Sequence, residues 1–402
     1  MPDSFYGLGI APNLLEKIDK LGFNTPTPIQ RKAIPIAIEG KDIIGIAQTG
    51  TGKTLAFGVP MIQQLAQKRG RGLVIVPTRE LAIQVKDALA PFAQILGLRT
   101  TVLIGGESMI PQLSSLRKSP RIIIATPGRL IDHIERRNIH LNDVCVLILD
   151  EADRMLDMGF APQIERILKI IPRDRQTMLF SATMPTEIIK IASSHMRLPV
   201  FTEIAPSGTA AEKVSQELFV VKKDSKNALL GKLLLQYKGS VLLFTRTKIG
   251  ARKVTQFLRK TGSNAAEIHS DRSLAQRKEA LNGFKSGKYR ILVATDIASR
   301  GIDVSGIELV INYDLPDDPG NYVHRIGRTG RAGQEGHAIS FATPDQGRDV
   351  RNIESLIRTS ISLSEHPEMP SERLFSTSKA PTKIKYSYRS RPNRYHYRRQ
   401  GR

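Results

Sequence analysis

The sequence contains a single cysteine, Cys145, and it lies within the apolar run 144–149. One thiol excludes an intramolecular disulfide and a zinc site built from cysteines. No apolar run approaches the roughly 18 residues of a membrane-spanning helix, and the N-terminus has no basic stretch leading into an apolar segment. We therefore expect a cytoplasmic protein that is neither exported nor inserted into a membrane.

Acidic residues are also scarce, with 38 Asp and Glu against 60 Lys and Arg, so the formal net charge is +22. Residues 371–402 hold ten Lys or Arg and one acid, but the rest of the chain is basic as well. This surplus favours a polyanionic partner, because each phosphate that a basic side chain neutralises releases a counterion. Charge alone leaves nucleic acid and an anionic membrane surface as alternatives.

Hydrophobic residues make up 40% of the 402 positions, which is enough for more than one buried core. Short apolar runs alternate with amphipathic segments of helical length, such as 80–96 and 248–260. This alternation predicts an α/β fold with parallel sheets flanked by helices. The expected strands are 73–76, 122–125, 144–149, 241–244, 291–294 and 309–311. Polar residues follow five of these runs, at the sheet edge where α/β proteins bind ligands.

Domain boundaries follow from a change in composition. Residues 200–214 contain small residues, a Pro and a Gly, and they separate two strand–helix blocks of similar length. We expect a first domain over 1–199, a linker over 200–214, a second domain over 215–370 and a basic tail over 371–402.

The segment 47–54, AQTGTGKT, fits a phosphate-binding loop, although Ala47 replaces the usual first glycine. Gly50 and Gly52 would let backbone N–H groups turn toward phosphate. Lys53 would reach the β- and γ-phosphate oxygens, and Thr54 would ligate Mg²⁺ at the start of a helix. The segment predicts binding of ATP or GTP; the alternative is a flexible glycine turn.

Two acids, Asp150 and Glu151, follow the apolar run 144–149, where paired carboxylates are costly unless they have a role. We expect Asp150 to hold the Mg²⁺ shell, and Glu151 to orient and deprotonate the attacking water. The alternative is a solvated acidic turn.

Residues 322–331, YVHRIGRTGR, place Arg325, Arg328 and Arg331 around two glycines. Guanidinium groups held near a γ-phosphate stabilise the transition state of its transfer, so we expect these arginines to face the nucleotide. A basic surface patch is the alternative. If the arginines lie in the second domain, ATP would favour a closed form and hydrolysis would release it.

These segments and several others occur in an order that resembles the DEAD-box ATP-dependent RNA helicases of superfamily 2, in particular their bacterial RhlE-like branch. The literal DEAD is residues 150–153. The matching segments, within residues 5–341, are GFNTPTPIQ, AQTGTGKT, PTRELA, GG, TPGR, DEAD, SAT, LLFTRTK, ATDIASRGID and HRIGRTGR.

The resemblance implies two tandem RecA-like domains that bind ATP and Mg²⁺ in their cleft. It implies that Gln30 reads the adenine edge, that Phe5 stacks on the base and that Asp303 contacts the ribose. Arg328 and Arg331 take the γ-phosphate and finger roles. The phosphate loop adds Gln48, Thr49, Gly50, Thr51, Gly52, Lys53 and Thr54 to the ATP-binding residues. Coupling of hydrolysis to RNA separation is implied for Asp153, Ser181, Thr183 and His324.

For RNA, the resemblance implies contacts at the strand ends of both domains. The implied residues are Arg79, Gly105, Gly106, Thr126, Arg129, Thr245, Arg277, Thr295 and Gly301. Hydroxyls, arginines and backbone amides bind phosphate and sugar without reading bases, so we expect low sequence specificity. The chain departs from the family at Ser270 and Leu274, where Gly and Gln are common, and this puts local loop geometry or RNA contact in doubt.

The sequence thus predicts an RNA-dependent ATPase with a monomeric core that unwinds short duplexes or remodels RNA–protein complexes. A DNA-dependent translocase and a non-unwinding, ATP-gated RNA clamp stay as alternatives. Tyrosines alternate with arginines in the tail, which favours a segment without a fixed fold that tethers RNA. Ribosomal or RNA-decay proteins are the expected partners, and ribosome assembly, RNA decay and cold adaptation stay open as roles.

Overall fold

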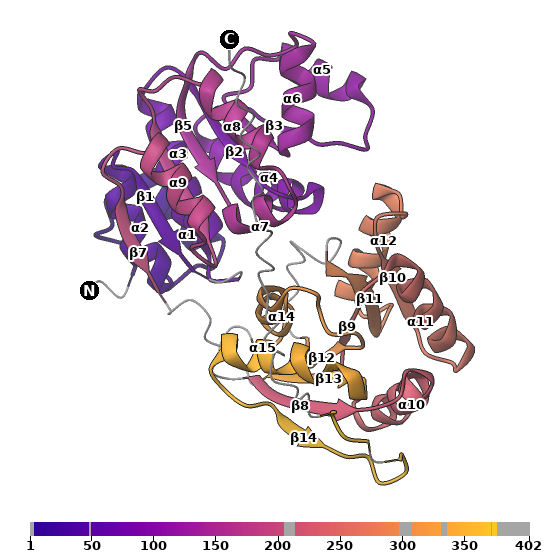
Figure 1. Ribbon diagram of the computed structural model, residues 1–402. Helices are drawn as coiled ribbons and strands as arrows, with labels where there is room; N and C mark the ends of the chain where they lie inside the picture. The colour runs from indigo at the N-terminus through magenta and orange to yellow at the C-terminus, as the bar shows by residue number, and fades with distance from the viewer. Residues whose placement is uncertain are drawn as a thin grey trace, which may run out of the picture.

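The computed structural model describes residues 4–47, 50–204, 214–296, 307–330, 336–370 and 372–375. Two α/β domains follow each other along the chain and form two lobes (Figure 1). Within these ranges, no helix is both long and apolar enough to cross a membrane.

The first domain is built on a sheet whose seven described strands run in the order β3-β4-β2-β5-β6-β1-β7, with parallel pairing throughout. The strands are β1 (Ile43–Ile46), β2 (Arg71–Ile75), β3 (Thr100–Leu103), β4 (Ile122–Ala125), β5 (Val144–Leu149), β6 (Gln176–Ser181) and β7 (Val200–Glu203). The helices are α1 (Pro12–Lys20), α2 (Pro28–Ile38), α3 (Lys53–Gln67), α4 (Arg79–Ile95), α5 (Met109–Arg117), α6 (Pro127–Glu135), α7 (Ala152–Asp157), α8 (Ala161–Ile170) and α9 (Thr186–His195).

The second domain repeats this plan, with a parallel sheet in the order β10-β11-β9-β12-β13-β8-β14 among the described strands. Its strands are β8 (Val214–Val220), β9 (Val241–Thr245), β10 (Ala265–Ile268), β11 (Ile291–Thr295), β12 (Leu309–Asn312), β13 (Gly336–Ala342) and β14 (Ser362–Ser364). Its helices are α10 (Lys226–Gln236), α11 (Lys248–Lys260), α12 (Leu274–Lys285), α14 (Pro319–Ile326) and α15 (Gly347–Ile357), with 3₁₀ turns η1 (Lys223–Ser225) and η2 (Pro344–Gln346).

Each sheet separates two apolar clusters, one on each face. Neighbouring strand residues alternate between the clusters, as Ile43 and Ile44 do in the first domain and Leu242 and Leu243 do in the second. Because helices cover both faces of a parallel sheet, its inner strands carry apolar residues on both faces. This explains why the continuous apolar runs predicted the strands, and it confirms the α/β class.

The predicted linker was wrong at both of its ends. Residues 200–203 form β7, which pairs with β1, and Val214 already begins β8. As an edge strand, β7 exposes half of the Phe201 side chain, so its sequence lacks the apolar run of an inner strand. Residues 205–213 lie outside the described residues.

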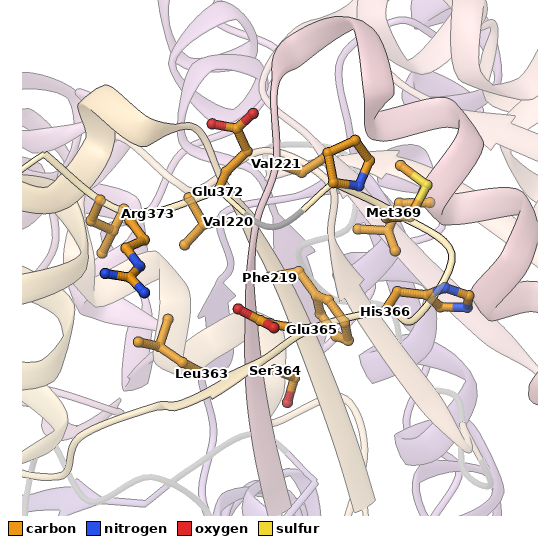
Figure 2. Close-up of a pocket in the computed structure, with 13 residues that line it drawn as sticks. Phe219, Val220, Val221, Leu363, Ser364, Glu365, His366, Met369, Glu372 and Arg373 are labelled. Atoms are coloured by element: carbon orange, nitrogen blue, oxygen red, sulfur yellow. The ribbon is translucent and has the colours of Figure 1, made fainter.

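The second domain also extends past its predicted end at residue 370. Glu372 forms an ion pair of 3.0 Å with Lys222, and the N–H of Phe375 donates to the carbonyl of Pro344 at 2.8 Å. Figure 2 shows this end of the chain beside β8 and β14, where Phe219, Leu363 and Met369 line a pocket of about 320 Å³. The part of the second domain that the structure describes therefore reaches residue 375, and 376–402 lie outside the described residues.

One buried carboxylate, Asp42, ties together the start of three neighbouring strands of the first sheet. Its Oδ1 accepts from the N–H of Thr177 at 2.7 Å, its Oδ2 from the N–H of Arg197 at 2.6 Å, and its carbonyl from the N–H of Val200 at 2.8 Å. The side chain is 5% exposed, so these donors replace the water that the charge would otherwise bind.

We predict that Asp42→Ala lowers the free energy of unfolding by about 2–4 kcal/mol, because one buried and one partly buried N–H lose a charged acceptor. Urea denaturation followed by circular dichroism measures the change. Asp143→Ala is the matched control, since Asp143 pairs with Arg71 at a partly exposed site and its loss should cost about 0–1 kcal/mol. Equal effects of the two substitutions would contradict the prediction.

Candidate active site

The loop between β1 and α3 holds Lys53 in a fixed position. Gly50 and Gly52 adopt positive φ angles of 84° and 88°, and Gly52 caps α3. Lys53 is only 6% exposed, and its Nζ donates to the carbonyl of Ala47 across the loop at 2.8 Å. The ammonium group is therefore presented at the carboxyl end of β1, at the N-terminus of a helix, as phosphate binding requires. Thr51 and Thr54 flank it, while Gln48 and Thr49 lie outside the described residues.

Gln30 is buried against this loop. It closes a capping box with Thr27 at the start of α2, where its Oε1 accepts from the N–H of Thr27 at 2.8 Å. Its Nε2 donates to the carbonyl of Gly52 at 3.0 Å, and a Cβ added to Gly52 would overlap this amide nitrogen. An amide has two donor hydrogens and two acceptor lone pairs, so Gln30 keeps one of each for a ligand.

The structure does not place Phe5 in the nucleotide cavity. Phe5 is 2% exposed and belongs to the apolar core of the first domain. Two aromatic side chains line the cavity together with Gln30 and Lys53: Phe92, which is 1% exposed, and Phe23, which is 42% exposed. Sequence reasoning missed Phe23, although it lies within the quoted GFNTPTPIQ segment. A ring that stacks on a base needs an exposed face, and only Phe23 of the three has one.

Asp150 and Glu151 leave the end of β5 as two adjacent buried carboxylates, 3% and 5% exposed. Asp150 accepts the N–H of Glu151 at 2.9 Å, and Glu151 adopts a left-handed backbone with φ 52°. Burial raises the pKa of Asp150 to about 6, although Lys53 opposes this shift.

Glu151 has the opposite shift. Burial alone would raise its pKa, but Arg154 and Lys53 outweigh this effect and lower the pKa to about 2, with a smaller contribution from Arg328. Arg154 is 4% exposed, and its Nη1 pairs with a carboxylate oxygen of Glu151. Sequence reasoning missed Arg154; its spacing three residues from Glu151, on one helix face, is the signal that could have found it.

The donor set around Asp150 fits Mg²⁺. A carboxylate and the hydroxyl of Thr54 are oxygen ligands of the kind Mg²⁺ prefers, and the ion commonly takes its other ligands from water and phosphate. No group of three or more His, Cys, Asp or Glu in the described part of the chain could hold a metal by itself.

Asp153 joins the acidic segment to the end of β6. Its Oδ2 accepts from the N–H and the hydroxyl of Thr183 at 2.8 and 2.9 Å, and from the N–H of Ala182 at 3.1 Å. Its own N–H donates to Oγ of Ser181 at 3.2 Å. The predicted coupling residues of the first domain therefore form one hydrogen-bonded group.

Residues of the second domain complete this site. Arg328, which is 4% exposed, lines the cavity of about 580 Å³ that also contains Lys53, Asp150 and Glu151. His324 lies beside it in a small cavity shared with Asp153 and α7 of the first domain. Figure 1 shows α14, which carries His324, facing α7. Arg331 and Asp303 lie outside the described residues.

Two protein-family models match this chain, one in each domain. Residues 27–191 match the model of the DEAD/DEAH box helicases, and residues 225–333 match that of the helicase conserved C-terminal domain. The chain is a DEAD-box ATP-dependent RNA helicase. It is 45% identical over 87% of its length to the ATP-dependent RNA helicase CshA of Listeria monocytogenes, covering 68% of that protein. It is 43% identical over 90% of its length to the ATP-dependent rRNA helicase RRP3 of Candida albicans, covering 69%. The RhlE-like branch stays a prediction.

The domain arrangement of this helicase resembles that of an RNA-bound relative. S. cerevisiae Dbp5 bound to RNA and ADP BeF3 aligns over 90% of this chain and 96% of its own, with a TM-score of 0.81 at 28% identity. A Dbp5 variant bound to Gle1 and IP6 aligns over similar shares at 29% identity, but with a TM-score of 0.71.

In the first domain of the helicase, the predicted RNA-binding residues lie close together at one edge of the sheet. Arg79 begins α4 and lies against the Gly105–Gly106 turn, where a Cβ at Gly106 would overlap its guanidinium. Arg129 donates to the carbonyl of Glu107 at 3.1 and 3.2 Å, just after that turn. Thr126 lies beside them as the N-cap residue of α6.

In the second domain the predicted RNA-binding residues differ in their exposure and in their partners. Thr295 ends β11 and is partly exposed. Thr245 is fully buried and its hydroxyl donates to the carbonyl of Thr247 at 3.2 Å, so its contact with RNA stays a prediction. Arg277 pairs with Glu80 of the first domain at 2.9 Å, so its guanidinium contacts protein. Gly301 lies outside the described residues.

Arg325 also differs from its prediction. It is 1% exposed and forms a two-pronged ion pair with Asp296 at 2.6 and 2.7 Å. It also donates to the side chain of Asn312 and to the carbonyl of Asp314. Arg325 therefore anchors α14 inside its own domain, while Arg328, one turn later, faces the nucleotide cavity.

The position of His324 generates a pH prediction. Burial between the domains lowers its pKa to about 4, and the opposing effect of Asp153 is smaller. Once the domains separate, His324 regains an ordinary pKa near ~6.5. Protonation thus favours the open form, so closure is fully supported above about pH 6.5 and weakens as the pH falls toward 4.

We expect RNA affinity in the presence of ADP·BeF3 to fall by about tenfold between pH 7.5 and 5.5. The reason is that His324 binds a proton in the open form below about pH 6.5 but stays neutral in the closed form. Fluorescence anisotropy with labelled RNA measures this. His324→Gln should flatten the pH dependence, whereas His140→Gln, at an exposed loop position of the first domain, should leave it as in the wild type. The assignment fails if His324→Gln retains the full dependence.

Proposed function

We propose that this helicase uses ATP to close its two domains on RNA, and that closure separates short duplexes or remodels RNA–protein complexes. The observation that carries the proposal is that Arg328 of the second domain lines one cavity with Lys53, Asp150 and Glu151 of the first. A site with residues from two domains is complete only when they close. ATP hydrolysis would therefore be tied to the closed state.

The chemistry follows from the charges of the site. Mg²⁺ bound with ATP would neutralise phosphate oxygens, with Asp150 and Thr54 as its ligands from this chain. Lys53 and Arg328 would stabilise charge on the γ-phosphate as it transfers. Arg154, Lys53 and Arg328 favour the charged form of Glu151, so we propose that it orients the attacking water by accepting its hydrogen bond and then takes up its proton.

The RNA side of the proposal rests on the strand-end group of Arg79, Gly105, Gly106, Thr126 and Arg129. These residues offer guanidinium, hydroxyl and backbone groups, which suit phosphate and sugar. Contacts of this kind tolerate any sequence, so one strand would be held by its backbone while closure bends it. The basic segment 376–402, with nine Lys or Arg and no acid, supports an additional tethering role.

The cellular role is proposed more broadly. The Candida relative is named an rRNA helicase, which favours ribosome biogenesis for this chain. We propose that it acts in the cytoplasm as a monomeric core and that ribosomal or RNA-decay proteins are its partners.

The first test is steady-state ATP hydrolysis without nucleic acid, with single-stranded RNA, with duplex RNA carrying an overhang and with matched DNA. We expect strong stimulation by RNA and little by DNA, because a 2′-hydroxyl distinguishes the two. Equal stimulation by DNA would favour a translocase instead. Stimulation without release of a labelled strand from the duplex would favour a clamp.

The second test is Glu151→Gln, which keeps the shape of the side chain but removes its charge. We expect ATP turnover to fall by about a hundredfold or more, since the uncharged amide is a weaker acceptor for the water and cannot take up its proton. RNA binding with ATP should persist or strengthen, because closure does not need this carboxylate. Glu165→Gln, at an exposed position of α8, is the control and should behave as the wild type. Wild-type turnover by Glu151→Gln would refute the role of Glu151.

A further inference from the structure

The first residue of α12, Leu274, is buried by the other domain. It is 8% exposed, and it belongs to the apolar cluster formed by α1, α3, α4 and one face of the first sheet. All other described members of that cluster lie between Phe5 and Phe180, so Leu274 is its only member from the second domain among the described residues. Neither apolar cluster of the second domain includes Leu274.

An ion pair next to Leu274 establishes this contact independently. Arg277 lies one turn further along the same face of α12, and its Nη2 is 2.9 Å from Oε2 of Glu80 in the first turn of α4. The two side chains are only 10% and 4% exposed. Leu81, which follows Glu80, belongs to the same cluster as Leu274. One face of α12 therefore contacts the start of α4 through an apolar group and a charged group.

The two groups contribute differently to closure. Arg277 and Glu80 leave water when they pair, so their attraction is offset by desolvation, although the pair fixes the register of the two helices. Leu274 bears no such cost, because its side chain only gains from leaving water. When the domains separate, Leu274 returns to solvent, so its burial stabilises only the closed form.

Leu274 departs from the family pattern described above, in which Gln is common at this position. A glutamine here would bring an amide into an apolar cluster, where its donors and acceptor would need partners. Leucine needs none.

We propose that Leu274 is a positioning residue that stabilises the closed, RNA-bound arrangement and thereby lowers the RNA concentration needed for ATP hydrolysis. The inference rests on the proposed function, because it assumes that closure on RNA precedes hydrolysis. It does not involve Leu274 in the chemistry, since the residue lies outside the nucleotide cavity. The effect should therefore appear in the dependence on RNA and not in turnover at saturating RNA.

The test compares Leu274→Gln, Leu274→Ala and Leu274→Met in RNA-stimulated ATPase assays. Burial of a leucine corresponds to about a ten- to hundredfold change in the closure equilibrium. We expect the RNA concentration at half-maximal rate to rise about tenfold or more for Gln and Ala, with kcat unchanged. Leu274→Met keeps an apolar side chain of similar volume and should stay close to the wild type.

The matched control is Leu235→Gln, at a 71% exposed position of α10 in the same domain, which should change neither parameter. The melting temperature without RNA or nucleotide should be unchanged in all variants, which separates domain positioning from folding. A half-maximal RNA concentration within about twofold of the wild type for Leu274→Gln would overturn the inference, as would a loss confined to kcat. A wild type that RNA does not stimulate would instead refute the proposed function.

Discussion

The site depends on two neighbouring carboxylates that are held out of water. Asp150 and Glu151 follow a buried strand, and each charge must be balanced by cations because desolvation disfavours it. The positive charge of Arg154 compensates the negative charge of Glu151 at short range, and Lys53 and Arg328 add to this effect. The charge of Asp150 is compensated less completely, because Lys53 does not outweigh the effect of burial. A further cation beside this carboxylate would therefore stabilise its charged form. Mg²⁺ with ATP supplies positive charge at that carboxylate.

This charge balance makes the arrangement of the domains part of the chemistry. Arg328 reaches the carboxylates from the second domain, and His324 lies beside Asp153 in the same contact region. Asp153 in turn accepts hydrogen bonds from Thr183 and shares one with Ser181. These contacts form a contiguous path from the domain boundary to the end of β6, through which closure and the state of the acidic segment can influence each other.

Much of the fold could be predicted from sequence because both sheets are parallel and buried. The runs 122–125 and 144–149 coincide with β4 and β5, since these inner strands carry apolar residues on both faces. The edge strand β7 escaped prediction because one of its faces is exposed. Where polar residues follow an inner strand directly, as Asp150 and Glu151 do, the sheet topology brings them to the predicted edge.

The side-chain partners could not be predicted in the same way. Arg325 and Arg328 share a motif and differ by one helical turn, yet one is bound to Asp296 and the other faces the nucleotide cavity. Phe5 and Phe23 are both near the adenine motif, but burial decides which can stack. In each case the decisive neighbour comes from a distant part of the chain, and local periodicity contains no information about it.

Contacts between domains are even harder to predict from sequence patterns, because they depend on how two separately folded units meet. Arg277 was expected on RNA and is found on Glu80, and Leu274 next to it was only a departure from the family pattern. The catalytic groups are fixed by strand ends, whereas Leu274 and Arg277 of α12 contact the start of α4 without lining the nucleotide cavity themselves. A residue at that meeting point can therefore change how readily the domains close while the ATP-binding residues stay the same. This separation explains how an RNA requirement could be tuned within a family whose nucleotide site is constrained by its charge balance.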